Sequence, residues 1–385
     1  MITIAVIHNL LTGGARRRLS NQLSCFAEPF TEMCLESAAP ITDDAIVVPF
    51  SRRSPRLMRG LRPPARYIDL LALELAWRRL SARLSELAPD AIYINPCQYL
   101  QAPPLDARIL SRALYFCDEV RRVDYEPDAA ASRSHLTRPA YALLYRRERS
   151  LDRRTAYGVA AIATNSQYSA REIQRAYGRE SSVVRLGVAP SLLRVPLDPM
   201  EARGFLLSVG TLIPSKGHDL VVRAAALSLS RPNVTVVSSR GSPGEEQRLS
   251  DLARAVGVNL DIRVGIPDVE LAGLYGSALA TLYLSRREPF GLASLEAQCH
   301  GCPVIVADEG GLPETIIDGA TGWICERDPA AAAALIDRLG DNAIRDRMSA
   351  AAREHGQTWT WESSALQVED LLAALATRHS KVDTR

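Results

Sequence analysis

The chain has 385 residues, of which 47% are hydrophobic, and a formal net charge of +2. This length predicts about two domains, and the apolar content suffices for two cores, which excludes a disordered chain. Residues 1–200 carry 28 Lys and Arg against 20 Asp and Glu, whereas residues 201–385 carry 18 against 24. An anionic partner would meet the first half, although solvated arginine-rich helix faces explain the same excess and are favoured.

Composition also bears on the compartment. Seven cysteines without disulfide-framework spacing indicate a reducing environment, and no apolar run reaches the roughly 18 residues of a membrane span. The N-terminal MITIAVIHNLL is typical of a buried strand and not of a signal peptide. We expect a cytoplasmic protein without an integral membrane segment. Cys299 and Cys302 have metal-site or redox spacing but no second pair, so we expect packed side chains there.

The first half alternates strands with helices. It opens with a strand over Ile2–Ile7, passes Gly13-Gly14 and enters a helix over Ala15–Phe26, as a Rossmann-like domain does, although the full glycine fingerprint is missing. An ordinary tight turn explains the two glycines equally well. Further strands are predicted over Ala45–Pro49, Ala91–Asn95, Ala113–Phe116, Val159–Thr164 and Val183–Leu186, with helices over Ile68–Leu87, 140–154 and from Ser169.

Two features of this half invite a functional interpretation. Residues 51–67 hold six arginines and three prolines, which suits a solvated loop better than a surface for acidic lipids or acidic acceptors. Polar residues follow two of the strands, at Asn95 to Gln98 and at Asp118-Glu119. Because ligands of open α/β sheets bind beyond the carboxyl ends of strands, Asn95, Gln98, Asp118 and Glu119 are candidate acceptor contacts.

The second half repeats the alternation after a proline-rich segment, Ala189–Glu201, where we place the domain boundary. Strands are predicted over Phe205–Val209, Val234–Val237, Leu260–Val264, Ala280–Leu284, Pro303–Ala307 and Gly322–Cys325. Strands that alternate with helices predict an α/β fold with parallel, doubly wound sheets.

Lys216 lies in a loop between Gly210 and Gly217, directly before a helix predicted over His218–Leu229. An ammonium beside free backbone N–H groups at a helix start suits a phosphate, although most surface lysines are only solvated charges. A second such place follows the strand that ends near Leu284. There Glu288 precedes the turn at Phe290-Gly291, and Glu296 follows on a predicted helix. Turn glycines beside a helix start again favour an anion.

Several motifs together resemble glycosyltransferase family 4, which comprises retaining nucleotide-sugar enzymes. The similarity is strongest in VGTLIPSKGHDL, in the stretch Asp261–Trp323 and in the terminal TWTWE, and it continues more weakly through GGA, LYRRERS and TNSQYSAREI. Its most specific element is the E-x7-E pair, Glu288 and Glu296, set within EPFGL and followed by GG and PE.

The resemblance implies the GT-B fold, in which two Rossmann-like doubly wound parallel-sheet domains face a central cleft. Residues 1–190, completed by 359–385, would form the acceptor-binding domain, and residues 200–358 the donor-binding domain. The last helix, expected over Trp359–Thr377, would cross back to the N-terminal domain, with Trp361 packing at the crossing.

The resemblance also implies roles for single residues. Lys216 would bind the donor diphosphate, Glu296 the ribose hydroxyls, and Glu288 with the following backbone the sugar and phosphates. A carboxylate suits hydroxyls, whereas an ammonium and N–H groups suit a pyrophosphate. The donor-binding set is Gly13, Gly14, Gly210, Thr211, Lys216, Val264, Gly265, Glu288, Pro289, Phe290, Gly291, Leu292 and Glu296, and the catalytic set is Glu288, Asp118 and Lys216.

The family needs no metal and no cofactor beyond its donor, for which UDP or GDP sugars are expected here. Two positions depart from its pattern. Thr211 stands where many members have Arg, and Cys117 to Glu119 stand where members commonly have a His. Asp118 could accept a hydrogen bond from a substrate hydroxyl in its place.

We therefore expect a retaining, metal-independent glycosyltransferase that acts on a small specialised-metabolite scaffold. A lipid-linked or cell-envelope glycan is the alternative acceptor, which leaves a peripheral membrane contact open. A GT-B epimerase or phosphorylase, or a non-catalytic nucleotide-sugar sensor, are alternative functions. Nucleic acid is not an expected partner.

Overall fold

The computed structural model describes residues 2–11, 13–52, 62–125, 138–189, 192 and 204–383. The chain divides into two compact units, an N-terminal unit of Met1–Arg185 with Glu362–Arg385 and a C-terminal unit of Leu186–Trp361. Most of the predicted linker, residues 190–191 and 193–201, lies outside the described residues, as do residues 53–61 of the arginine-rich segment.

The N-terminal unit is built on a seven-stranded parallel sheet in the order β3-β2-β1-β4-β5-β6-β7. Its strands are β1 Ile4–Asn9, β2 Phe30–Leu35, β3 Ile46–Val48, β4 Ala91–Cys97, β5 Ala113–Phe116, β6 Ala161–Thr164 and β7 Ser182–Val183. Every residue of β1 and β4 is buried, as both faces of a parallel sheet are covered. The chain runs outward from β1 to β3 and then returns to β4, so the topological switch point lies between β1 and β4.

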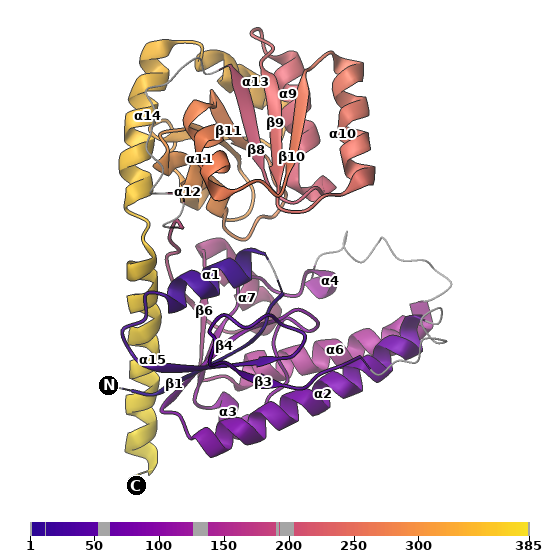
Figure 1. Cartoon of the computed structure of the whole chain (residues 1–385), viewed down its shortest axis with the longest axis vertical. Helices are drawn as coiled ribbons and strands as arrows, with labels where there is room; N and C mark the ends of the chain where they lie inside the picture. Colours follow the sequence, from indigo (N-terminus) through magenta and orange to yellow (C-terminus); the bar gives the residue numbers. More distant parts are fainter. Residues whose placement is uncertain are drawn as a thin grey trace. The chain divides into compact units, whose positions relative to one another are not determined.

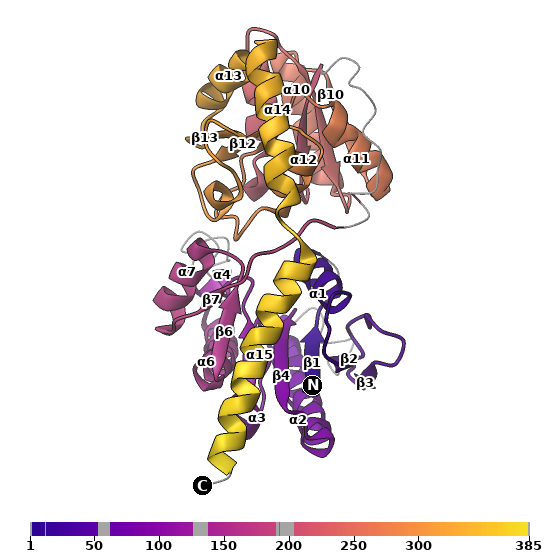
Figure 2. The same cartoon turned by 90° about the vertical axis from the view of Figure 1, so that its left-hand side faces the viewer.

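Helices cover this sheet. They are α1 Gly14–Leu23, α2 Arg62–Leu87, α3 Ala107–Leu110, α4 Arg122–Tyr125, α6 Arg138–Gly158, α7 Gln167–Tyr177 and α15 Trp361–Asp383. Helices α2 and α6 lie side by side (Figure 1), and Arg147 of α6 donates to Glu74 of α2 at 2.7 Å. Helix α15, yellow in Figure 2, is tied to the rest of this unit by Glu369, which accepts the N–H groups of Ala27 and Glu28 at 2.8 and 2.7 Å.

The C-terminal unit contains a six-stranded parallel sheet in the order β10-β9-β8-β11-β12-β13. The strands are β8 Phe205–Val209, β9 Asn233–Ser238, β10 Leu260–Val264, β11 Ala280–Tyr283, β12 Val304–Ala307 and β13 Gly322–Cys325. The helices are α9 His218–Leu227, α10 Pro243–Val256, α11 Asp268–Ser277, α12 Leu292–Cys299, α13 Pro329–Arg338 and α14 Asn342–Gln357, with short 3-10 turns η3 Pro214–Lys216 and η4 Leu312–Thr315. Its switch point lies between β8 and β11.

The chain enters and leaves the C-terminal unit through adjacent segments. The N–H of Val188 donates to the carbonyl of Trp359 at 3.1 Å, and a Cβ on Gly187 would lie 2.4 Å from the backbone nitrogen of Trp361. A larger residue at 187 would therefore push the two segments apart. Trp361 is buried, with 2% of its surface exposed, in agreement with the predicted packing role.

The sequence predicted this alternation but missed strand β2, because its Glu32 breaks the apolar run. Glu32 is nevertheless buried. Its carboxylate accepts hydrogen bonds from His8, from the N–H groups of Ile41 and Thr42 and from the Thr42 hydroxyl. Burial opposes its ionisation, but these donors outweigh burial and lower the pKa of Glu32 to about 2. Helix α15 begins at Trp361, two residues after the predicted start.

Candidate active site

Lys216 and Glu288 meet at the switch point of the C-terminal sheet. Lys216 follows β8 through the turn η3, and Glu288 follows β11, so each comes from one of the two strands that flank the switch point. Their side chains form an ion pair with Nζ and Oε2 2.6 Å apart, and 18% and 13% of the two side chains are exposed. A cation and a carboxylate thus stand where ligands of doubly wound sheets bind.

Three neighbours keep Glu288 ionised. Burial opposes ionisation, but the charge of Lys216 and hydrogen bonds from Lys216, Ser285 and Tyr283 outweigh it and lower the pKa of Glu288. The Ser285 hydroxyl donates to Oε2 at 2.8 Å. Lys216 Nζ also lies 3.5 Å from the Tyr283 hydroxyl and 5.6 Å from the centre of its ring. Sequence reasoning missed Ser285 and Tyr283, because a Tyr and a Ser near a buried strand carry no motif.

Two glycines fix the backbone around Glu288. Gly310 has a φ of +68°, and a Cβ there would lie 2.2 Å from the carbonyl oxygen of Glu288. Gly291, with a φ of +117°, ends the turn after Pro289-Phe290 and precedes Leu292, the first residue of α12. Only glycine adopts these conformations readily. The predicted turn at Phe290-Gly291 and the helix that carries Glu296 are both present.

Glu296 has surroundings unlike those of Glu288. It lies on α12 with 3% of its surface exposed, and the Tyr275 hydroxyl donates to its Oε2 at 3.0 Å. The Tyr275 ring stacks on His300, with ring centres 5.9 Å apart and planes at 6°. The two glutamates of the E-x7-E pair are therefore held by different partners, which suits two different parts of one ligand.

The loop after β8 is organised by a histidine that the sequence did not single out. His218 is buried, shares a hydrogen bond with Ser208 at 2.8 Å through Nδ1, and lies 3.3 Å from the carbonyl of Thr211 through Nε2. Burial lowers the pKa of His218 to about 4, so the ring is neutral at neutral pH. An ideal Cβ on Gly210 would contact the Lys216 side chain at 3.4 Å, so this glycine lies against the Lys216 stem.

Val264 and Gly265 lie at the end of β10, the edge strand, two places from β8. Val264 is 43% exposed, and the Gly265 N–H donates to Ser238 at 2.8 Å. Arg263 is paired with Asp261 and Glu270 at 2.7 and 3.0 Å. The residues predicted beside a nucleobase therefore offer an apolar side chain and backbone at the carboxyl end of their strand.

In the N-terminal unit, polar residues gather at the switch point between β1 and β4. Gln98 donates from its backbone to the carbonyl of Asn9 at 3.1 Å and lies 3.4 Å from the Asn9 side-chain oxygen, which also accepts the Ser37 hydroxyl at 2.8 Å. Gly13, with a φ of +116°, and Gly14 begin α1 beside this edge. Asn9 and Ser37 were not predicted.

A second polar network in this unit centres on Arg18, which sequence reasoning also missed. Its guanidinium binds Asp118 and Asn95, two of the predicted acceptor contacts, and is 1% exposed. Asn95 is fully buried, whereas 15% of the Asp118 side chain is exposed. Glu119 instead pairs with Arg122 at 2.7 Å, and 39% of its side chain is exposed. The structure thus separates the two neighbouring carboxylates by environment.

One group among the described residues has donor atoms close enough for a metal ion, namely His8, Glu32 and Cys34. His8 Nδ1 accepts the N–H of Leu10, so Nε2 carries the proton and donates to Glu32 at 2.8 Å. Both Glu32 oxygens already accept protein donors. This chemistry fits a hydrogen-bonded core cluster. Cys299 and Cys302 are both buried, as expected of packed side chains.

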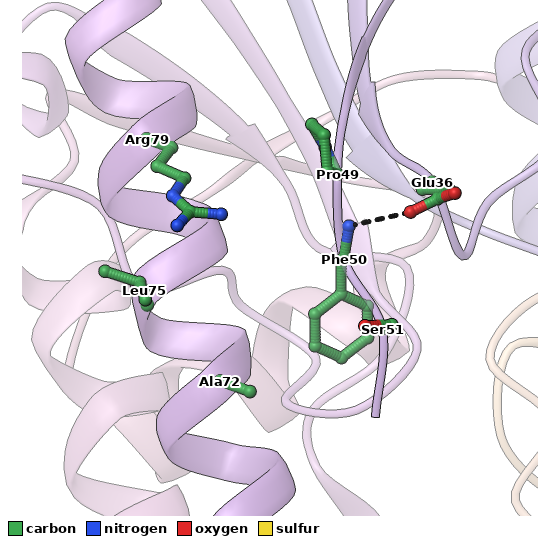
Figure 3. Close-up of a pocket in the computed structure, with 7 residues that line it drawn as sticks. All are labelled: Glu36, Pro49, Phe50, Ser51, Ala72, Leu75 and Arg79. Atoms are coloured by element: carbon green, nitrogen blue, oxygen red, sulfur yellow. Dashed lines mark hydrogen bonds between the residues drawn. The ribbon is translucent and has the colours of Figure 1, made fainter. Parts of the chain in front are cut away.

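A small cavity of about 80 Å³ lies in the N-terminal unit, beyond the carboxyl ends of β2 and β3 (Figure 3). It is lined by Glu36, Pro49, Phe50, Ser51, Ala72, Leu75 and Arg79. One oxygen of Glu36 accepts a hydrogen bond from the Phe50 N–H at 3.1 Å. The cavity holds only a small functional group, and none of its lining residues is among the predicted site residues.

Most of the C-terminal unit matches a known protein family. The family described as Glycosyl transferases group 1 matches residues 193–355, which include Lys216, Glu288 and Glu296. Residues 193–355 are therefore similar in sequence to this glycosyltransferase family. The resemblance found in the motifs of the sequence is thereby confirmed for the region where it was strongest.

Curated relatives include enzymes named D-inositol 3-phosphate glycosyltransferase. The protein from Acidothermus cellulolyticus is 32% identical over 252 residues, which cover 58% of this chain and 55% of the relative. That from Streptomyces avermitilis is 33% identical over 222 residues, or 53% of this chain and 44% of the relative. The chain thus spans about half the length of the relatives it matches.

Solved structures match over almost the whole chain. Sucrose-phosphate synthase from Thermosynechococcus elongatus has a TM-score of 0.73 at 19% identity, covering 98% of this chain and all of the other. Anabaena HepE in complex with UDP has a TM-score of 0.70 at 16% identity, covering 97% and 100%. WaaG, a glycosyltransferase involved in lipopolysaccharide biosynthesis, has a TM-score of 0.69 at 18% identity, covering 97% and 99%. These likenesses confirm the predicted GT-B fold.

Within the described residues, no helix is long and apolar enough to cross a membrane.

Proposed function

We propose that this protein is a retaining glycosyltransferase that moves a sugar from a nucleoside diphosphate to an acceptor. The observation that carries the proposal is the Lys216–Glu288 pair at the switch point, within a stretch similar in sequence to a glycosyltransferase family. Lys216 would bind the diphosphate as a point charge, as lysines commonly bind phosphates. Glu288 would then accept hydrogen bonds from hydroxyls of the donor sugar.

The remaining donor contacts follow from the same geometry. Backbone N–H groups of Gly291 and Leu292 precede and begin α12, where the helix dipole favours an anion. Glu296 would accept the ribose hydroxyls, and Val264-Gly265 would lie by the base. Because Lys216 leaves Glu288 to bind phosphate, Ser285 and Tyr283 would keep the buried carboxylate hydrogen-bonded when a donor is present.

In the transfer itself, the bond from the sugar C1 to the phosphate oxygen breaks and a bond from C1 to the acceptor oxygen forms. With attack on the same face of the sugar, the departing phosphate oxygen takes the proton of the acceptor hydroxyl. The products are the glycosylated acceptor and the nucleoside diphosphate. Lys216 and the backbone donors would stabilise the charge that develops on the diphosphate, so the reaction would need no metal ion.

The acceptor is proposed more broadly. A small hydroxylated molecule is favoured, and the names of the relatives put D-inositol 3-phosphate first among the compounds to test. A specialised-metabolite scaffold is the second class, and an envelope glycan, suggested by the name of WaaG, is the third. UDP sugars come first among donors, because a structure of similar fold contains UDP. Function in the cytoplasm, where nucleotide sugars are made, completes the proposal.

The test measures UDP or GDP release from UDP-glucose, UDP-N-acetylglucosamine and GDP-mannose, with EDTA present, against a panel of these three acceptor classes. Release should depend on an acceptor, and Lys216→Ala and Glu296→Ala should abolish it, whereas Arg248→Ala should not. Arg248 is a matched surface cation of the same unit, paired only with acidic side chains. Unchanged turnover in Lys216→Ala and Glu296→Ala would contradict the proposal.

Two other outcomes favour the alternative functions. Sugar turnover without an acceptor, or dependence on inorganic phosphate, would indicate an epimerase or a phosphorylase. Tight binding of a nucleotide sugar without turnover across the whole panel would indicate a sensor.

A further inference from the structure

Arg18 is an arginine inside the protein. It is the third of three consecutive arginines on α1, but it shares the buried face of that helix with Leu19, Gln22 and Leu23. A guanidinium is always charged and has five N–H donors, so burying it is costly unless every donor is satisfied. The surroundings of Arg18 meet this demand in full.

The five donors are shared among four side chains. Nε and Nη2 bind the two oxygens of Asp118 at 2.8 and 2.9 Å, so the carboxylate is held bidentately. Nη2 also donates to Asn95 at 2.9 Å. Nη1 donates to Gln22 at 2.7 Å and to the Tyr93 hydroxyl at 3.0 Å. The guanidinium carbon lies 3.8 Å from the centre of the Phe116 ring.

These contacts fix the orientation of Asp118. Planar, bidentate pairing sets both the position and the plane of a carboxylate, which a single-point contact cannot do. The Asp118 carbonyl is also held, since it accepts Asn165 Nδ2 at 3.1 Å. Gln22 extends the network by donating to Ser364 of α15 at 2.9 Å. Asp118 is thus tied to α1 and β4 through Arg18, and to α15 through Arg18 and Gln22.

Arg18 and Asp118 differ in solvent exposure, which determines which of the two side chains a ligand would contact. Asp118 follows β5 at the carboxyl edge of the sheet, and 15% of its side chain is exposed, against 1% for Arg18. A molecule at this edge would therefore meet the Asp118 side chain and not the guanidinium. A carboxylate oxygen accepts hydrogen bonds and repels anions, so hydroxyl or ammonium groups suit this position and phosphate does not.

Stability alone is a weak reason for such a pair. Replacing a buried ion pair by apolar side chains of similar volume is often neutral or stabilising, because desolvation offsets the attraction. A fixed, partly exposed carboxylate is in contrast what hydroxyl recognition needs, since positioning accounts for much of the efficiency of a binding group.

We propose that Arg18 is a positioning residue that holds Asp118 as the hydrogen-bond acceptor for a hydroxyl group of the bound acceptor substrate. This inference rests on the proposed function. It adds to that function a specific subsite and its chemistry: a hydroxyl binds here, and any phosphate of the acceptor binds elsewhere.

The experiment compares wild type with Arg18→Lys, Arg18→Met, Asp118→Asn and the double variant Arg18→Met/Asp118→Asn. The double variant is needed because Arg18→Met alone leaves Asp118 without its cation and weakens folding. Arg83→Met is the control, since Arg83 is 67% exposed and pairs with Glu86 on the surface. Circular dichroism and thermal melting confirm folding. Calorimetry gives the Kd for UDP, and UDP release gives kcat and KM for the best donor and acceptor of the panel.

Each Arg18 or Asp118 variant should lower kcat/KM for the acceptor by about a hundredfold, the effect of misplacing a group by roughly 1 Å, while the Kd for UDP stays unchanged. The losses of Arg18→Met and Asp118→Asn should not multiply in the double variant, because the two residues act as one unit. Multiplying losses, wild-type kinetics in Arg18→Met, or a Kd for UDP that rises in parallel would overturn the inference. A wild type that binds UDP but transfers sugar to no hydroxyl would overturn it too, whereas a wild type that binds neither UDP nor GDP would contradict the proposed function first.

Discussion

Each unit carries an ion pair at the carboxyl edge of its sheet, and the two pairs are built for opposite behaviour. Lys216 holds Glu288 through one short contact, and both side chains are partly exposed. Arg18 is buried and holds Asp118 bidentately. Its remaining N–H groups donate to Asn95, Gln22 and Tyr93. A compact ammonium on a flexible stem can change partners, whereas a forked guanidinium with every donor satisfied cannot. The C-terminal pair can therefore open to bind a ligand, whereas the N-terminal pair stays closed and holds Asp118 in place.

A large effect is expected from the backbone that supports the exchangeable pair. Gly310→Ala should lower turnover by about a hundredfold or more, because its Cβ would displace the Glu288 carbonyl and misplaced groups lose roughly this much activity. Gly319→Ala is the control, since Gly319 has a similar φ of +75° but open space around its Cβ. Equal activity of the two variants would show that the Glu288 loop does not need its fixed position.

The two pairs should also differ in how much they contribute to the free energy of unfolding. Arg18→Met should destabilise the protein by roughly 3–5 kcal/mol, the usual cost of leaving a buried charge unpaired. Lys216→Ala should cost only about 1–2 kcal/mol, because Ser285 and Tyr283 still donate to Glu288. Thermal melting of both variants measures the difference. A larger loss for Lys216→Ala would reverse the assignment of the fixed and the exchangeable pair.

A pH effect is expected from the core of the N-terminal unit. Burial raises the pKa of Asp152 to about 6, although Tyr177 and the Ala102 N–H donate to it. The folded state therefore binds a proton more tightly than the unfolded chain, and the free energy of unfolding should fall as pH rises from about 4 to 6, by up to about 3 kcal/mol. Asp152→Asn should flatten this slope in urea titrations at pH 4 and 7. An unchanged slope would assign the effect to other groups.

The smallest effect should come from the Tyr283 hydroxyl. Tyr283→Phe keeps the ring beside Lys216 but removes one of several donors to Glu288. A neutral hydrogen bond contributes about 0.5–1.5 kcal/mol, so turnover should fall by roughly 2- to 10-fold. The decrease should appear in donor KM or in kcat, with acceptor KM unchanged. A change confined to acceptor KM would show that Tyr283 acts in the acceptor site and not in the donor site.

The sequence predicted more of the site in the C-terminal unit than in the N-terminal unit. In the C-terminal unit, local patterns predicted the strands and the glycine turns and singled out Glu288 and Glu296. Lys216 and Glu288 were found because each lies in the loop that directly follows a strand. Their contact could also have been predicted from topology, since β8 and β11 flank the switch point. The Tyr275 contact to Glu296 could not, because no motif marks a tyrosine on a neighbouring helix.

In the N-terminal unit the deciding contacts join residues far apart in the sequence. Three consecutive arginines predict a solvated helix face. Only the helical spacing of Arg18, Leu19 and Gln22 indicates that Arg18 lies on the buried face. Asp118 and Asn95 lie 100 and 77 positions from Arg18. Strand β2 was missed in the same way, because the donors that make Glu32 tolerable come from other segments. Polar burial is a tertiary property that local patterns do not encode.

The central claim is that Lys216 exchanges Glu288 for a diphosphate while Arg18 keeps Asp118. Calorimetric titration of UDP, with EDTA present, into wild type, Lys216→Ala and Arg18→Lys tests it most directly. Loss of a hydrogen bond to a charged group costs about 1.5–3 kcal/mol, so Lys216→Ala should weaken UDP binding by roughly 10- to 100-fold, and Arg18→Lys should leave it unchanged. Equal affinity of wild type and Lys216→Ala would contradict the account.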